Sequence, residues 1–319
     1  MRRAFLLILM VLPLALSWGQ QEGGQRGIER FRNPTVRTGI GLGIQSVSFN
    51  VDEAGLSNNQ INVSPNTPIH LLIGAEWRSI GLALRLDLPL SDREVEERGR
   101  TQFVNFQFQY FGDQLAVDLV YQLHQGMYVE NPSSFDEEFS SIKLPDFALQ
   151  TIAANLLWAR NPEYSLAAAY KLNARLPRST ASLVWLGGVS GIWLQGPGGP
   201  AKGMPAAAGT VAQEDVYFIA RTVAAGAGGT GTLQLGNWFL APLVGIAFGP
   251  QLVDYAAVGD SGLRWTVAPQ LVGRLSFGYN GDSFFAAFVA SADFRNVLVP
   301  DMDATQGSYL VEIVLGRRW

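Results

Sequence analysis

The chain has 319 residues, of which 16% are charged, 48% are hydrophobic and 35 are glycines. Its length allows one large all-β domain or two smaller domains. The formal net charge of −4 and the lack of any basic stripe exclude a nucleic-acid-binding surface. The sequence contains no cysteine, which excludes disulfides, thiolate metal sites and a cysteine nucleophile.

The N-terminal segment has the pattern of an export signal. Met1-Arg2-Arg3 is basic, the run AFLLILMVLPLAL is apolar, and Ser17-Trp18-Gly19 supplies small residues at a cleavage site. The apolar run is shorter than the roughly 20 residues that a membrane-spanning helix needs. We therefore predict a signal peptide at residues 1–19, a polar lead at 20–33 and one folded domain over 34–319.

Beyond the lead, apolar and polar residues alternate along most of the chain. In GLALRLDLPL, leucines occupy every second position from Leu82 to Leu90, and Arg85 and Asp87 lie between them. A period of two is typical of a β-strand with one apolar and one polar face. Thirteen segments are strand candidates: 36–50, 67–77, 80–90, 101–111, 115–129, 147–159, 163–173, 181–194, 217–235, 238–253, 263–279, 283–297 and 307–319.

The connections between these segments alternate between tight and long. Two-residue turn signals occur at Arg78-Ser79, Gly112-Asp113, Gly236-Asn237 and Asn280-Gly281. Longer polar loops lie at about 51–66, 91–100, 130–146 and 254–262. Short periplasmic turns and longer extracellular loops are typical of a transmembrane antiparallel β-barrel.

In such a barrel the leucine face contacts lipid and the polar face lines the interior. A closed barrel also satisfies every backbone hydrogen-bonding group, as the bilayer requires. The alternative is a soluble β-sandwich or lipocalin-like barrel with the leucines inside. Because single-chain bacterial barrels have even strand numbers, we predict an all-β fold of about 12 strands, with 14 as the alternative. We expect the miscounted strand near the Gly/Pro/Ala-rich stretch 196–210.

The last segment, GSYLVEIVLGRRW, alternates in the same way and ends on Trp319. A closing strand with a terminal aromatic residue resembles the signal that the outer-membrane assembly machinery recognises. Together with the export signal, it predicts location in the outer membrane of a Gram-negative bacterium. The expected partners are outer-membrane lipid and the barrel assembly machinery.

Several stretches resemble a known family of bacterial barrel proteins. They include NVSPNTPIHLLIGAEWRSIGLALRLDLP, TQFVNFQFQYFGDQLAVDLVYQLHQGMYVENP, SLVWLGGVSGIWL and NWFLAPLVGIAFGPQL. The family is known only as domain of unknown function 4421, and the similarity covers most of residues 45–319. The resemblance implies an outer-membrane barrel and brings no assigned activity, ligand or catalytic residue.

Six polar side chains on neighbouring strands are predicted to form a cluster inside the barrel: His70, Glu76, Arg85, Asp87, Asp118 and His124. A histidine beside a carboxylate is a candidate general base or metal ligand. We favour the interpretation that these residues fill the interior with ion pairs, since unpaired interior charge is costly. No metal-ligand spacing is present, and we predict neither a metal nor a cofactor.

Three later arginines are predicted to line the interior as an anion-attracting wall: Arg264, Arg274 and Arg295. Arginines lining a channel can determine its ion selectivity, and a barrel of 12 to 14 strands lies between filled and open barrels. The acidic loop 130–146 is either a constriction in the mouth or a plain surface loop.

The sequence therefore predicts an integral outer-membrane barrel of uncharacterised role, without enzymatic activity. A narrow, porin-like passive channel for an unidentified small solute and a structural or surface role both remain open. The alternative is an acyl hydrolase that acts on lipid A or phospholipid. GxSxG is absent, and both histidines lie on the face opposite lipid.

Overall fold

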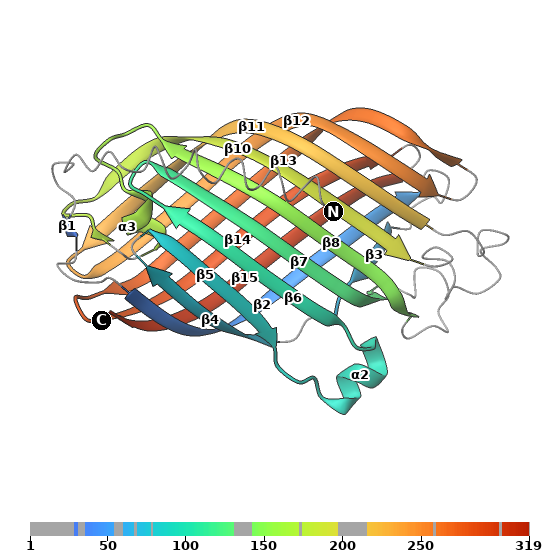
Figure 1. Cartoon of the computed structure of the whole chain (residues 1–319), viewed down its shortest axis with the longest axis horizontal. Coiled ribbons are helices and arrows are strands. Elements are labelled where there is room, and N and C mark those ends of the chain that lie inside the picture. The colour runs from blue at the N-terminus through green and yellow to red at the C-terminus, as the bar shows by residue number, and fades with distance from the viewer. Residues whose placement is uncertain are drawn as a thin grey trace.

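The computed structural model describes residues 29–30, 36–53, 60–66, 69–77, 79–130, 142–171, 174–196, 216–257, 260–299 and 302–318. These residues form antiparallel strands and two short helices (Figure 1). No helix among them combines the length and the apolar character needed to cross a bilayer. The elements are β1 (Glu29–Arg30), β2 (Val36–Glu53), β3 (Gln60–Ser64), β4 (Ile69–Trp77), β5 (Ile80–Asp87), α2 (Asp92–Arg98), β6 (Gln102–Phe111), β7 (Leu115–Val129), β8 (Ile142–Ala159), α3 (Leu166–Tyr170), β9 (Ala174–Arg175), β10 (Thr180–Gly196), β11 (Val216–Leu235), β12 (Trp238–Ala257), β13 (Asp260–Asn280), β14 (Phe284–Val299) and β15 (Met302–Arg318).

Twelve strands close into a ring in the order β2-β4-β5-β6-β7-β8-β10-β11-β12-β13-β14-β15, and β15 pairs with β2 again. The ladder from Met302↔Glu53 to Arg318↔Arg37 closes the ring. The strands are tilted against the barrel axis, with α3 at one end and α2 projecting from the side (Figure 1). The prediction of an antiparallel barrel of about 12 strands is confirmed.

The strands present their apolar faces outward. On β5, Leu82, Leu84 and Leu86 are 48%, 39% and 44% exposed, whereas Arg85 between them is 4% exposed. A belt of exposed large apolar side chains is unfavourable in water, and a hydrocarbon environment accommodates it. The soluble alternative, in which the leucines are buried, is therefore wrong.

The barrel narrows towards the end that carries the long connections. The strands β4, β5 and β6 are short, and beyond their ends the single strand β3 pairs with both β2 and β7. One strand thus takes the place of three, and the ring of twelve strands becomes a ring of ten at this loop end. The opposite end, with the tight turns, is the short-turn end.

Polar contacts seal the junction between β3 and the three short strands. The Thr101 hydroxyl accepts a hydrogen bond from the Asn66 backbone N–H at 2.8 Å and donates to the Gly126 carbonyl at 2.7 Å. The Asn66 amide donates to the carbonyls of Glu94 and Gly99. Backbone groups that leave the ladder at this point therefore find new partners, as they must in a membrane protein.

The interior is apolar at both ends. At the loop end, inward-facing side chains form a buried layer, the loop-end cluster: Val47, Val63, Met127, Val129, Ile142, Leu144, Phe147, Leu149, Ile192, Leu194, Phe218, Ala220, Val253, Tyr255 and Val297. At the short-turn end, residues 161–171, here called the plug, insert α3 into the barrel, with all five α3 residues buried. Inward-facing alanines on the wall, including Ala116, Ala224 and Ala241, leave room for it.

The plug explains the miscounted strand. We predicted a strand at 163–173, but this segment contains helix α3. Most of 196–210, where we expected the error, lies outside the described residues. The side chain of Ser165 caps the helix by accepting from the Ala168 N–H at 3.1 Å. The apolar run LAAAY matches both buried strand and buried helix, so its periodicity alone is ambiguous.

All four predicted loops differ in part from the observed connections. The segment 51–66 contains the end of β2 and the strand β3. The segment 91–100 contains the exposed helix α2, which begins with a capping box between Ser91 and Glu94. The segment 254–262 is mostly strand, because β12 runs to Ala257 and β13 starts at Asp260. Residues 142–146 of the predicted loop 130–146 belong to β8, and its centre lies outside the described residues. The predicted signal peptide at 1–19 and Trp319 also lie outside them.

Gly126 is predicted to be indispensable at the bulge in β7. Its φ is +86°, and an added Cβ would lie 2.3 Å from the Arg100 carbonyl oxygen. Substitution by alanine should lower the free energy of unfolding by about 1–3 kcal/mol because of backbone strain and this clash. Urea unfolding of the refolded barrel measures the effect. Gly229→Ala, where a Cβ meets nothing within 4 Å, is the control. Equal stability of the two variants would contradict the prediction.

Candidate functional site

Two cavities lie in the middle of the barrel, between the loop-end cluster and the plug. The mid-barrel cavity has a volume of about 150 Å³, and the short-turn cavity next to the plug has a volume of about 180 Å³. Arg85, Gln107 and Arg274 line both. These side chains therefore form the partition between the two cavities.

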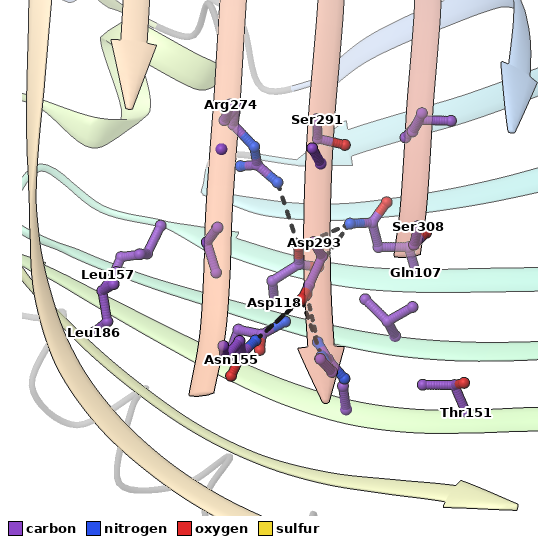
Figure 2. Close-up of a pocket in the computed structure, with 18 of the residues that line it drawn as sticks. Gln107, Asp118, Thr151, Asn155, Leu157, Leu186, Arg274, Ser291, Asp293 and Ser308 are labelled. Atoms are coloured by element: carbon purple, nitrogen blue, oxygen red, sulfur yellow. Dashed lines mark hydrogen bonds and ion pairs between the residues drawn. The ribbon is translucent and has the colours of Figure 1, made fainter. Parts of the chain in front are cut away.

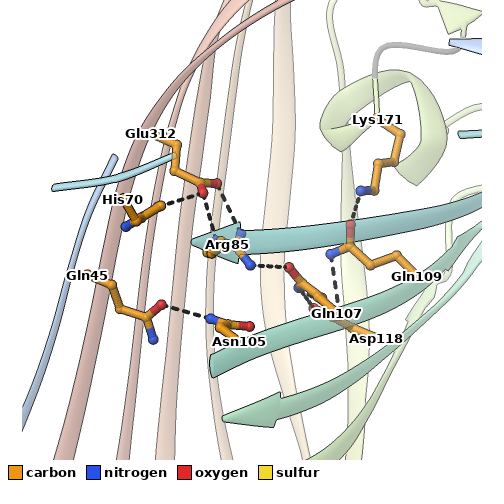
Figure 3. Close-up of polar contacts among 9 residues, drawn as sticks. All are labelled: Gln45, His70, Arg85, Asn105, Gln107, Gln109, Asp118, Lys171 and Glu312. Carbon is orange, nitrogen blue, oxygen red and sulfur yellow. Dashed lines mark hydrogen bonds and ion pairs between the residues drawn. The ribbon is translucent and has the colours of Figure 1, made fainter. Parts of the chain in front are cut away.

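The partition is a chain of polar contacts, here called the polar bridge, that crosses the interior from β15 to β13 (Figures 2 and 3). Arg85 binds Glu312 through two nitrogens, at 2.7 and 3.1 Å, and donates to Gln107 at 3.0 Å. Gln107 in turn donates to both oxygens of Asp118 at 2.8 Å. Arg274 lies 3.5 Å from Asp118 on the other side. Bidentate arginine–carboxylate geometry is the strongest form of such contacts.

A glycine allows His70 to join the bridge. His70 Nε2 lies 3.0 Å from Glu312 Oε1, although the two residues belong to β4 and β15 on either side of β2. Gly43 on β2 pairs with both residues. An added Cβ at this glycine would lie 2.6 Å from Glu312 Cγ and 2.7 Å from His70 Nε2. Only glycine leaves the space across which the two side chains meet.

A second ion pair lies nearer the short-turn end. Arg37 Nη2 donates to Glu76 Oε2 at 2.5 Å, and the guanidinium lies 5.2 Å from the centre of the Phe285 ring. Its Nε and Nη1 are buried and find no partner among the described residues, as is also true of Ser276 Oγ. Unpaired buried donors are uncommon.

Lys171 follows α3 and lines the short-turn cavity, and its ammonium group points toward Gln109 (Figure 3). The ammonium donates to the Gln109 side-chain oxygen and lies 5.3 Å from the centre of the Phe111 ring. Lys171 lies outside the membrane-spanning strands, and burial lowers its pKa from the usual 10.5 to about 8. The group that accepts the hydrogen bond from the Lys171 ammonium is the neutral side-chain amide of Gln109.

The predicted cluster is divided in the structure. His70 and Arg85 share Glu312, Asp118 holds the other end of the bridge, and Glu76 pairs separately with Arg37.

The two remaining members of the predicted cluster lie apart from the bridge. Asp87 on β5 lies opposite His70 on β4 in the strand ladder, but Asp87 Oδ1 has no hydrogen-bond partner among the described residues. His124 is buried against the Phe103 ring, at a centroid distance of 4.9 Å. Where the structure describes the chain, no group of three or more metal-binding side chains is found.

The three predicted arginines do not form a wall. Arg264 is exposed near the loop end of β13. Arg295 pairs with Asp293 on its own strand at 2.6 Å. Only Arg274 reaches the polar bridge. The three arginines therefore do not form one continuous anion-attracting surface.

Sequence reasoning missed five residues of the site: Arg37, Gln107, Gln109, Lys171 and Glu312. The two glutamines and the glutamate stood on the predicted inward faces, but nothing in one sequence indicated which strand they would meet. Lys171 was hidden by the incorrect strand assignment. Arg37 follows the same alternation as the inward glycines of β2.

A closed strand ring with an apolar exterior and an enclosed polar interior defines a transmembrane β-barrel of the outer membrane. The chain belongs to the family described as Domain of unknown function (DUF4421), whose model matches residues 29–310. A search of curated proteins found no matching sequence.

Several solved outer-membrane proteins match the chain at low sequence identity. The outer membrane protease OmpT from Escherichia coli matches at 9% identity and a TM-score of 0.42, over 89% of this chain and 96% of that chain. The toluene transporter TodX from P. putida matches at 8% identity and a TM-score of 0.33, over 91% of each chain. Ail, the attachment invasion locus protein of Yersinia pestis, matches at 8% identity and a TM-score of 0.23, over 88% of this chain and 97% of that chain. Such identities concern the fold alone.

One sequence-based prediction needs correction here. We predicted that the chain has no enzymatic activity, and the match to an outer membrane protease overturns this exclusion.

Breaking the central ion pair should destabilise the barrel more than removing it. Arg85→Met leaves a buried carboxylate beside an apolar side chain and should cost about 3–5 kcal/mol of unfolding free energy. Arg85→Met combined with Glu312→Gln should cost less than the sum of the two single changes, with a coupling of about 1–3 kcal/mol. Urea unfolding in detergent micelles measures all three variants. Additive effects would show that the two side chains are not coupled.

The unfolding free energy should rise with pH between about 8 and 10. Because the folded-state pKa of Lys171 is about 8 and its usual value is 10.5, the folded chain binds fewer protons in this range, which favours folding as the pH increases. Arg37 and Arg274 lower this pKa, whereas Glu76 and Asp118 raise it. Urea unfolding in chloride buffers measures the slope. The Lys171→Met variant should lack this rise in unfolding free energy with pH. If the variant showed the same slope as the wild type, the lowered pKa of Lys171 would not be its cause.

Proposed function

We propose that the protein is a sealed outer-membrane barrel whose interior is a solute-binding chamber, not a passage across the membrane. The observation that carries the proposal is the position of the two cavities, which lie between two buried apolar layers. One layer is the plug with its wall residues, and the other is the loop-end cluster. Among the described residues, each layer is a cluster of buried hydrophobic side chains, which hydrated ions cross only at a high energetic cost.

The plug is the element through which a solute would enter. It contributes no strand to the ring, so it can move without breaking the barrel ladder. Its backbone donates two hydrogen bonds to one turn, from the N–H groups of Leu166 and Ala167 to the carbonyls of Asp113 and Gly112, and one from the Asn161 N–H to Ser182 Oγ at 2.9 Å. By contrast, the loop-end cluster is built from the strands themselves. The chamber would therefore exchange solute with the periplasm.

The tyrosines of the plug supply further contacts. The Tyr170 hydroxyl donates to the Pro242 carbonyl at 3.0 Å, and the Tyr164 hydroxyl lies 2.8 Å from Thr230 Oγ1. With the side-chain hydrogen bonds of Asn161, Ser165 and Lys171, they join the plug to the wall through side chains and not through a strand ladder.

A gated channel is the second candidate, since the plug is separable from the ring. An acyl hydrolase finds less support. His70 and His124 are each only 1% exposed and face the interior, so neither can reach an acyl chain in the bilayer.

Planar-bilayer conductance tests the sealed chamber. The wild-type barrel should show no stepwise conductance, and neither should a plug-deletion variant, in which a short Gly-Ser linker replaces residues 162–178, that is, nearly all of the plug together with β9. When Phe147→Ser, Leu149→Ser and Phe218→Ser are added to that deletion, both seals are removed and steps should appear. Heat-modifiable electrophoretic mobility confirms folding of each variant. Steps in the wild type, or after plug deletion alone, would contradict the proposal, and the second result would identify a channel gated by the plug.

A further inference from the structure

The short-turn cavity has more positive than negative side chains. It is lined by Arg37, Arg85, Lys171 and Arg274, but by only two carboxylates, Glu76 and Glu312. The excess of cations is notable because the whole chain has a net charge of −4. A low-dielectric interior tolerates excess charge poorly.

The pairings leave one of these cations without a carboxylate partner. Arg85 is held by Glu312 through two hydrogen bonds, and Arg37 is held by Glu76. Arg274 faces Asp118 across the polar bridge. Lys171 has only the neutral Gln109 amide, and no carboxylate among the described residues lies within ion-pair distance of it.

Residues with unused donors line the same cavity. Arg37 is 6% exposed, and its Nε and Nη1 have no partner among the described residues. Ser276 is 1% exposed, and its hydroxyl is also unpaired there. Both residues line the cavity, as does Lys171. Three side chains from β2, β13 and the end of α3 thus present free hydrogen-bond donors, two of them cationic.

We infer that the short-turn cavity binds a small oxyanion, a phosphate or carboxylate group, held by Lys171, Arg37 and Ser276. An anion with several oxygens would compensate the charge of Lys171 and accept from the orphaned donors at once. The volume of about 180 Å³ limits the ligand to a small molecule. The inference rests on the proposed chamber only for access, and binding is measured without transport.

Thermal unfolding of the refolded full barrel in detergent tests the site at pH 7. Sodium phosphate and sodium succinate are compared with sodium chloride at equal ionic strength. Because a ligand that binds only the folded state stabilises it, the melting temperature should rise with phosphate or succinate and then saturate. Which of the two acts at lower concentration distinguishes a phosphate from a carboxylate ligand.

Two variants identify the residues, and one serves as a matched control. Lys171→Met should raise the melting temperature in chloride, since it removes an uncompensated cation, and should weaken oxyanion binding about tenfold or more. Ser276→Ala removes one donor and should weaken binding about two- to tenfold. Arg93→Met removes one positive charge from exposed α2 and should bind as the wild type does. A purely structural Lys171 would instead give a less stable variant with unchanged response to anions.

The inference is overturned if phosphate and succinate stabilise the wild type no more than chloride does, or if they stabilise Lys171→Met equally. If Lys171→Met fails to fold, the response of Ser276→Ala to phosphate and succinate provides the test: stabilisation equal to that of the wild type would overturn the inference. Conductance and binding are separate measurements. A barrel that conducts but binds oxyanions would refute the sealed chamber alone, and a silent barrel that does not bind them would refute this inference alone.

Discussion

Backbone groups cannot remain unpaired in hydrocarbon, and this constraint governs the whole molecule. The long ladder between β15 and β2 closes the ring and leaves no open edge. Where β4, β5 and β6 end, β3 continues the strand pairing with β2 and β7. Side chains such as Asn66 and Thr101 form hydrogen bonds with backbone groups that have no partner in the ladder there. The outward faces are then free to be apolar, and the polar residues gather inside.

The interior has its own requirement, because a ring of ten to twelve strands encloses more space than its wall side chains easily fill. Large apolar side chains fill the loop end, and a helix from a connecting segment fills the other. Between them, a chain of polar residues crosses the centre, and Gly43 provides the gap through which His70 reaches Glu312. This packing leaves two cavities and a cation, Lys171, that has no ion-pair partner among the described residues.

Alternation alone predicts the strand faces correctly, since Arg85 and its leucine neighbours lie on the sides that the period of two assigns. The segment 163–173 was misassigned because an unbroken apolar run has no period. Helix α2 had a readable signal in the Ser91 and Glu94 capping box, which a polar loop assignment overlooked. The partner of Arg85, Glu312, comes from a strand 227 positions later, and no local pattern in one sequence encodes such a pairing.

The inside-out polarity of the strands is the central claim, and nitroxide labelling of β5 tests it most directly. The chain contains no cysteine, so Leu82→Cys, Ala83→Cys and Leu84→Cys each provide a single attachment site. In lipid bilayers, labels at 82 and 84 should collide freely with oxygen and little with a water-soluble nickel chelate, while the label at 83 should be shielded from both. Ready access of the chelate to 82 and 84, or no alternation among the three positions, would contradict the account.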